Sequence, residues 1–162
     1  MKHRTLCGLL IASSLLAGCA APQKVVEAPY SSTEYAVLKT EGTATVQGQI
    51  FMKTRGGDVK YGAGSTIFFA PVTSYNLTRF QAVQARQQLK EPDPRAQPYN
   101  RTTVADGSGN FSFENVAAGE YLIFGSVIWE APSPYGLSTQ GGMISTRFVI
   151  KEGEVKKMIM TH

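Results

Sequence analysis

TTVADGSGNFSFENVAAGEY, residues 102–121, is the stretch that decides the fold of this chain. Its first four residues are β-prone, and the five that follow tolerate positive φ and include Asp106, Gly107 and Gly109. Phe111 and Phe113 then alternate with polar residues, so both rings are expected to face a core. The pattern predicts a β-hairpin with one buried face.

The same stretch leads directly into another strand. A second turn ends at Gly119, and a strand over residues 120–130 begins with Glu120 and Tyr121. Three consecutive strands are therefore expected from one uninterrupted segment.

Alternation elsewhere predicts further strands. Residues 43–52 alternate apolar or small residues with Thr45, Gln47 and Gln49, which is the period of a half-buried strand. Residues 66–72 form a short, nearly continuous apolar run, typical of a buried strand. Residues 143–151 and 155–161 flank a Glu-Gly-Glu turn and predict a last hairpin. Seven strands result.

Three stretches between these strands lack periodicity. Residues 53–64 carry four glycines and predict a long loop, and residues 131–141 predict another irregular piece. Residues 73–99 form a long insertion, in which Leu77, Phe80 and Val83 predict an amphipathic helical turn or two before three prolines end it. A loop of this length is expected to be either functional or loosely ordered.

Seven short strands separated by turn signals predict an all-β, Greek-key β-sandwich. G-Q-I-F from Gly48, G-A at 62–63 ahead of T-I-F-F at 66–69, and residues 103–121 together resemble the carboxypeptidase regulatory-like domain, a transthyretin-like sandwich. The resemblance covers most of residues 42–161, and it departs where Val-Ala-Ala-Gly at 116–119 lacks a proline and where residues 73–99 lengthen one loop. The resemblance is specific for the fold but indicates little about function, because such domains occur in many different proteins.

The N-terminus carries a targeting signal. Basic residues at positions 2–4 precede the apolar run 6–16 and the tetrapeptide Leu16-Ala17-Gly18-Cys19. The run is shorter than the about 20 residues that a membrane span needs. It resembles a bacterial lipoprotein signal, which implies that residues 1–18 are removed, that Cys19 is acylated, and that Cys19 becomes the first mature residue. The alternative is an ordinary secretory signal in which Cys19 is incidental.

The resemblance also implies a location in the cell envelope. Ala20 stands where an inner-membrane lipoprotein usually has Asp, which favours anchoring to the outer membrane, facing the periplasm. Residues 19–42 include Pro22, Pro29 and Ser31 without a sustained period, so a flexible, lipidated tether is expected ahead of a sandwich domain over residues 43–162.

Charge and cysteine content exclude several classes. The net charge is +4, and loss of Lys2 and Arg4 with the signal leaves 14 basic against 12 acidic residues, or +2. Such a balance gives no nucleic-acid footprint. Cys7 lies in the discarded run, so the mature chain is expected to have no free thiol, disulfide or cysteine metal site.

Catalytic residues are also missing from the pattern. His3 leaves with the signal and His162 is the last residue, so no histidine falls within the predicted sandwich to act as base or ligand. Asp106, Ser108 and Asn110 are spaced as turn residues and do not match a calcium-binding loop. We expect no enzyme, no cofactor and no metal.

Two classes of binding function remain. The first is a non-catalytic envelope lipoprotein whose sandwich binds or positions another envelope or surface protein. The alternative is a carbohydrate-binding module that uses exposed aromatic side chains, for which Trp129, Tyr135, Tyr61 and Tyr75 are the candidates. The competing interpretation of these rings is core or loop filling.

A partner site is predicted from strand direction. If successive strands reverse, loops 53–64, 107–110 and 131–141 gather at the end away from the tether. That end would collect Arg55, Lys60, Tyr61, Trp129 and Tyr135. Arginine and aromatic residues are enriched at interface hot spots, so we expect the rings to anchor an acidic partner that the cations steer. A solvated charged rim is the alternative.

Overall fold

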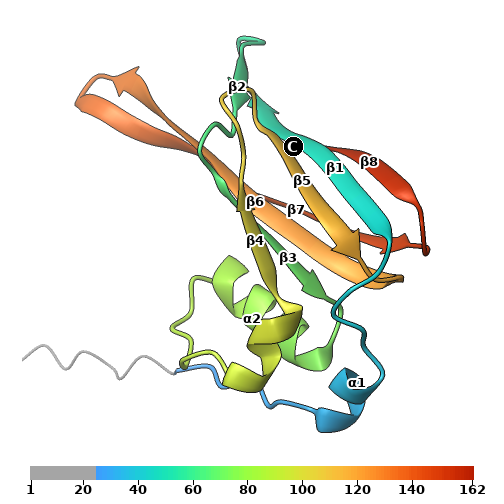
Figure 1. Ribbon diagram of the computed structural model, residues 1–162. Helices are drawn as coiled ribbons and strands as arrows, with labels where there is room; N and C mark the ends of the chain where they lie inside the picture. The colour runs from blue at the N-terminus through green and yellow to red at the C-terminus, as the bar shows by residue number, and fades with distance from the viewer. Residues whose placement is uncertain (1–24) are drawn as a thin grey trace, which may run out of the picture.

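Two four-stranded sheets face each other in the computed structural model, which describes residues 25–162 (Figure 1). The eight strands are β1 (Ala44–Lys53), β2 (Val59–Tyr61), β3 (Thr66–Pro71), β4 (Arg101–Val104), β5 (Asn110–Val116), β6 (Gly119–Ser133), β7 (Gly136–Ile150) and β8 (Val155–Met160). The first sheet has the order β2-β1-β5 with β8 also on β1, and the second has the order β4-β3-β6-β7. The predicted all-β sandwich is confirmed.

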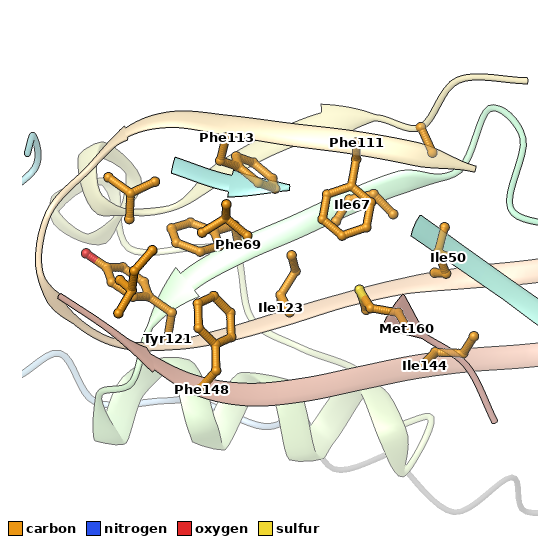
Figure 2. Close-up of a cluster of buried hydrophobic side chains, with 14 of the residues drawn as sticks. Ile50, Ile67, Phe69, Phe111, Phe113, Tyr121, Ile123, Ile144, Phe148 and Met160 are labelled. Carbon is orange, nitrogen blue, oxygen red and sulfur yellow. The ribbon is translucent and has the colours of Figure 1, made fainter. Parts of the chain in front are cut away.

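The core lies between the sheets and follows the alternation of the strands (Figure 2). Phe69 on β3 stacks on Phe113 of β5 and on Tyr121 of β6, with ring centroids 4.8 and 4.4 Å apart. Phe111 and Phe113 are 6% and 3% exposed, so both face the core as predicted. Phe111 also covers Gly48, directly opposite it on β1, where any side chain would collide with the ring. The aromatic rings therefore join the two sheets.

The hairpin predicted over residues 102–121 is wrong in its strand pairing. β4 pairs with β3 in the second sheet, whereas β5 pairs with β1 in the first. The turn between them therefore connects one sheet to the other. The turn chemistry is as expected: the Asp106 carboxylate accepts hydrogen bonds from the backbone N–H groups of Ser108 and Asn110, both at 2.8 Å, and Gly109 has φ +77°. Hydrogen bonds from the Asn110 side chain and from both backbones hold the pKa of Asp106 below its ordinary value. The same turn chemistry thus serves a sheet-to-sheet connection.

The predicted last hairpin is also wrong. β7 belongs to the second sheet, and β8 runs parallel to β1 from Thr45 opposite Val155 to Ile50 opposite Met160. Glu152 at the turn accepts hydrogen bonds from the backbone and hydroxyl of Thr43, which ties the connection to the start of β1. The chain changes sheets here because β1 offers a free edge.

Residues 25–162 form eight strands, one more than the seven predicted. The extra strand is β2, which lies in the stretch expected to be a long loop and pairs with the end of β1. Residues 131–141, expected to be irregular, extend the β6–β7 hairpin, which pairs from Gly119 opposite Ile150 to Ser133 opposite Gly136. Backbone pairing between β6 and β7 thus continues past the core. The hairpin therefore projects from one end of the sandwich (Figure 1).

Three helices gather at the opposite end (Figure 1): α1 (Ser32–Ala36), α2 (Ser74–Gln84) and the 3-10 helix η1 (Pro94–Tyr99). Residues 25–42 and 73–100 together form this region, which we call the helical annex. The tether predicted over residues 19–42 is therefore folded from residue 25 onward, with Tyr35 only 1% exposed and Val26 bridged to Leu89. Cys19 and the predicted signal lie outside the described residues. Among residues 25–162, no helix is long and apolar enough to cross a membrane.

Strand directions place the loops at two ends. β1 and β6 run away from the annex, and their antiparallel neighbours return to it. Residues 117–118 and 151–154 therefore lie at the annex end, while the β1–β2 turn, residues 105–109 and the β6–β7 tip lie at the other end. The loops expected to gather at the end away from the tether, 53–64, 107–110 and 131–141, do lie at one end.

Candidate ligand-binding groove

A groove of about 590 Å³ lies between the helical annex and the outer face of the second sheet. β3 and β6 supply its floor, and α2 with the chain leading to η1 supplies its walls. Its lining residues are Phe68, Phe69, Ala70, Asn76, Arg79, Phe80, Val83, Leu89, Pro92, Gln97, Asn100, Arg101, Thr102, Leu122 and Phe124. Its volume is within the range of small-molecule sites.

The floor of the groove is aromatic. Phe68 on β3 is directly opposite Phe124 on β6, and the two rings stack with centroids 4.9 Å apart and planes within 9°. Phe80 of α2 approaches Phe124 at 5.3 Å with a tilt of 48°. Phe68 nevertheless remains 43% exposed, because the annex does not extend over it completely. The result is an apolar platform that is open on one side.

Hydrogen bonds fix α2 above this platform. Thr73 caps the helix by accepting from the backbone N–H of Asn76 at 3.1 Å. The Asn76 side chain, 6% exposed, donates to the carbonyl of Pro71 at 2.9 Å and to the side-chain oxygen of Asn100 at 3.0 Å. The buried Asn76 amide therefore joins the end of β3 to the end of the insertion, and it holds these two parts of the groove at a fixed position.

The N-terminal segment supports the helix from the far side. Tyr35 of α1 packs against Tyr30, Tyr75 and Tyr99, with the Tyr30 ring stacked at 4.6 Å. Its hydroxyl lies 3.2 Å from that of Thr73, and burial raises the pKa of Tyr35. Glu34 accepts from the backbone N–H of Ser74, the first residue of α2, at 2.7 Å. The groove wall therefore depends on residues that precede the sandwich.

Tyr75 was one of the four candidate stacking rings, and that assignment is wrong. Its side chain is 2% exposed within this tyrosine cluster, and its hydroxyl accepts from the backbone N–H of Asp93 at 2.7 Å. The ring holds the insertion together and does not face solvent.

The residues of the predicted distal site lie on two hairpins. Arg55, Lys60 and Tyr61 belong to the β1–β2 hairpin, where Tyr61 packs edge-on to Phe51 with centroids 6.3 Å apart. Trp129 is half-buried against the core, whereas Tyr135 is fully exposed at the β6–β7 tip. Four strand steps from Trp129 to Ser133, about 13 Å, and the turn that follows separate the two rings.

A second hollow, of about 570 Å³, opens on the outer face of the first sheet. Polar residues in its lining include Gln47 and Gln49 from β1, Ser112 from β5 and Lys157 from β8. It has no stacked aromatic floor. Within residues 25–162, no group of three or more His, Cys, Asp or Glu residues is placed to hold a metal.

The sequence reasoning missed Phe68, Phe80 and Phe124 as residues of this candidate site. One signal was present: the apolar run at 66–72 breaks the alternation expected of a strand with one wet face. Phe68 is the residue that breaks it, because its face of the sheet is the groove floor. A strand that is apolar on both faces indicates a second contact surface.

No protein-family model matches the chain, and no curated protein matches it. Its fold is similar to the crystal structure of a "putative carbohydrate binding protein" from Pseudomonas aeruginosa, with a TM-score of 0.74. The two sequences are 23% identical, and the match covers 84% of this chain and 100% of that chain. At this level of identity the two proteins share a fold.

Proposed function

We propose that this protein is a non-catalytic binding module that holds a carbohydrate in the groove beneath the helical annex. The stacked pair Phe68 and Phe124 carries the proposal, because the apolar C–H face of a sugar ring packs on an exposed aromatic face. Amides of Asn100 and Gln97 border the groove and can hydrogen-bond hydroxyl groups at the edge of the ring. An apolar floor with a few convergent polar groups is the usual composition of a small-molecule site.

The structural similarity supports this choice between the two binding classes. The Pseudomonas aeruginosa protein, whose name refers to carbohydrate binding, has the same two-sheet fold. The four predicted aromatic candidates are replaced in this proposal by Phe68, Phe80 and Phe124, which do lie together.

We further propose that the sandwich is a transthyretin-like Greek key and that the protein is an envelope lipoprotein acylated at Cys19. The parallel pairing of β1 with β8, and the repeated passage of the chain between sheets, support a Greek-key arrangement. The tetrapeptide Leu16-Ala17-Gly18-Cys19, which resembles the acylation signal of bacterial lipoproteins, supports a lipid anchor at Cys19. Cell fractionation of a Cys19→Ser variant tests it: the variant should leave the membrane fraction, and retention there with incorporated palmitate would contradict acylation at this residue.

A binding comparison tests the groove. Phe124→Ala should weaken a bound glycan at least about tenfold, equivalent to about 1.4 kcal/mol, by isothermal titration calorimetry. Tyr135→Ala is the matched control, since it removes an exposed ring at the other end of the molecule. Loss of glycan binding in the control with full binding in Phe124→Ala would place the site at the hairpin tip.

A protein partner at the β6–β7 tip is the second candidate. Tyr135, Leu137 and Ile128 are 100%, 73% and 63% exposed on this projecting hairpin. Exposed apolar side chains on one projecting element are common at protein contacts. A photo-crosslinking amino acid at position 135 should then yield a defined adduct in native envelopes. An adduct from position 68 but not from position 135 would reject the tip as the protein contact.

A further inference from the structure

The sheet face that floors the groove continues beyond the annex. Phe68 is 43% exposed, and β6 and β7 run on together from the groove toward the hairpin tip (Figure 1). Residues paired across two strands have their side chains on the same face, so the register identifies this surface. The outward pairs that follow the groove are Phe124 with Ser145, Ser126 with Met143, and Ile128 with Gly141.

Apolar side chains form a path along these pairs. Phe124 belongs to the groove floor, Met143 lies in the next pair on the neighbouring strand, and Ile128 lies in the pair after that. Ile128 is 63% exposed, and four strand steps separate it from Phe124, a distance of about 13 Å. The apolar surface therefore extends past the groove by more than the length of one sugar ring.

No ionisable side chain lies on this face between the groove and Glu130. The outward positions of β3 and β4 on the same face are also uncharged, namely Thr66, Phe68, Thr102 and Val104. Glu130 itself accepts a hydrogen bond from the Thr139 hydroxyl at 2.7 Å. The outer face of the first sheet, in contrast, includes Glu114 on β5 and Lys157 on β8. Depletion of charge is typical of the centre of a binding interface.

The composition of the path suits an amphipathic chain. In two of the three pairs a large apolar side chain lies beside a serine hydroxyl, and in the third Ile128 lies beside Gly141, which has no side chain. A sugar ring likewise has an apolar C–H face and hydroxyl groups at its edge, which can exchange hydrogen bonds with serine. A chain of such rings repeats this combination along its length.

We infer that the ligand is an extended, uncharged glycan chain that continues from the groove over Met143 to Ile128. This inference rests on the proposed carbohydrate function and adds the length and the charge of the ligand. A monosaccharide in the groove would leave the apolar surface at Ile128 in water, whereas further sugar units cover it. The charge-free face offers a charged unit no counter-charge beyond the groove.

A length series tests the inference with the purified full chain. Glucose, mannose, galactose and N-acetylglucosamine oligomers, from the monosaccharide to the octasaccharide, are titrated by calorimetry beside oligogalacturonates of equal length. We expect the hexasaccharide of a bound series to bind at least about tenfold more tightly than its disaccharide, with a plateau at greater length. Equal affinity of the disaccharide and hexasaccharide overturns the extended site and leaves the carbohydrate function standing. Tighter binding of the oligogalacturonates overturns the uncharged ligand, and binding of none rejects the carbohydrate function itself.

A variant at position 128 locates the path. Ile128→Ser should weaken the hexasaccharide about tenfold and leave the disaccharide unchanged, so that the preference for length disappears. Ile159→Ser is the matched control, because Ile159 is 66% exposed on the outer face of the other sheet, and it should retain the preference. Equal losses for both lengths in Ile128→Ser, or no loss for either, would contradict contact between Ile128 and the chain.

A photo-crosslinking amino acid at position 128 distinguishes a glycan from a protein on this face. We expect it to form an adduct with the bound hexasaccharide. A protein adduct in native envelopes that excess hexasaccharide does not reduce would assign the face to a protein partner and overturn the inference.

Discussion

The sandwich core and the helical annex are built by different means. The core is a single cluster of aliphatic and aromatic side chains that alternate inward along strands. The annex has a small cluster centred on Tyr35, Tyr75 and Ala96, and it is completed by hydrogen bonds, caps and cations over rings. Arg95, for example, lies 4.2 Å from the centre of the Tyr30 ring.

The difference indicates a division of labour between the two regions. A closely packed core has one arrangement and supplies stability, whereas a region with few buried apolar contacts opens at lower free energy. The groove lies where the two meet, with a floor of strands from the sandwich and a wall from the helix of the annex. Binding residues are often placed on connecting segments that a rigid scaffold positions.

The largest expected effect comes from two adjacent phenylalanines that face opposite sides of β3. Phe69→Ala should lower the free energy of unfolding by about 3–5 kcal/mol, because the ring is 2% exposed among Phe113, Tyr121 and Phe148. Phe68→Ala, at 43% exposure, should lose about 1 kcal/mol or less but lose glycan binding. Urea unfolding with calorimetric titration checks both. Similar stability losses in the two variants would remove the distinction between scaffold and groove.

The next expected effect separates the annex from the sandwich. Tyr35→Ala should release residues 25–42 and loosen α2 while the sheets stay folded, at a cost of about 2 kcal/mol in global stability. Hydrogen exchange should speed up in the annex alone, and glycan affinity should fall with it. Tyr135→Ala, which removes a fully exposed tyrosine, should change neither. If β1 and β6 lost protection as well, the two regions would be one cooperative unit.

An effect of about the same size is expected at the turn that joins β4 to β5. Gly109→Ala should cost about 1–3 kcal/mol, because φ is +77° and a methyl group there would overlap the carbonyl oxygen of Ile50. Gly107→Ala has open space and should stay within about 0.5 kcal/mol of the parent protein. Thermal unfolding of the pair measures the difference. A neutral Gly109→Ala would contradict the turn geometry on which the sheet crossing depends.

The smallest expected effect is a pH dependence confined to the annex. Hydrogen bonds from Arg95 lower the pKa of Asp93 to about 2, below the about 3.9 of an unfolded aspartate. A lowered pKa means that the stabilisation is complete above pH 4 and is lost as pH falls toward 2. The amide hydrogen exchange rate of η1, relative to that of an unfolded chain at the same pH, should therefore rise as pH falls over this range. Asp93→Asn should flatten the rise. Asp58→Asn, in the β1–β2 turn, should leave it unchanged; an equal flattening there would contradict the assignment to Asp93.

The sequence predicted the sandwich more fully than the annex, for physical reasons. Alternation around Phe111 and Phe113 reports local burial, so the core faces and turn positions could be read from neighbouring residues. The sheet to which each strand belongs could not be read in this way. The turn after Ala105 is compatible both with a hairpin and with a connection between sheets. Pairing of β4 with β3 decides between them, across the insertion at residues 73–99.

The groove was harder still to predict. Its floor and walls come from segments far apart in the chain, and its tyrosine support comes from residues that read as a tether. Tyr30 and Tyr35 show no period, since single rings packed against a helix leave none. Only the apolar residue at position 68, on the outer face of a strand, marked the site in advance.

Mapping of amide chemical shifts tests the central claim most directly. The ¹⁵N-labelled full chain is titrated with a glycan that it binds, and the shifts are assigned to residues. We expect the largest changes in β3 around Phe68, in β6 around Phe124, and in α2 near Arg79, with little change at the β6–β7 tip. Changes confined to the tip around Tyr135, or to the outer face of the first sheet around Gln47, with the groove unmoved, would contradict the claim that the annex and the second sheet together form the binding site.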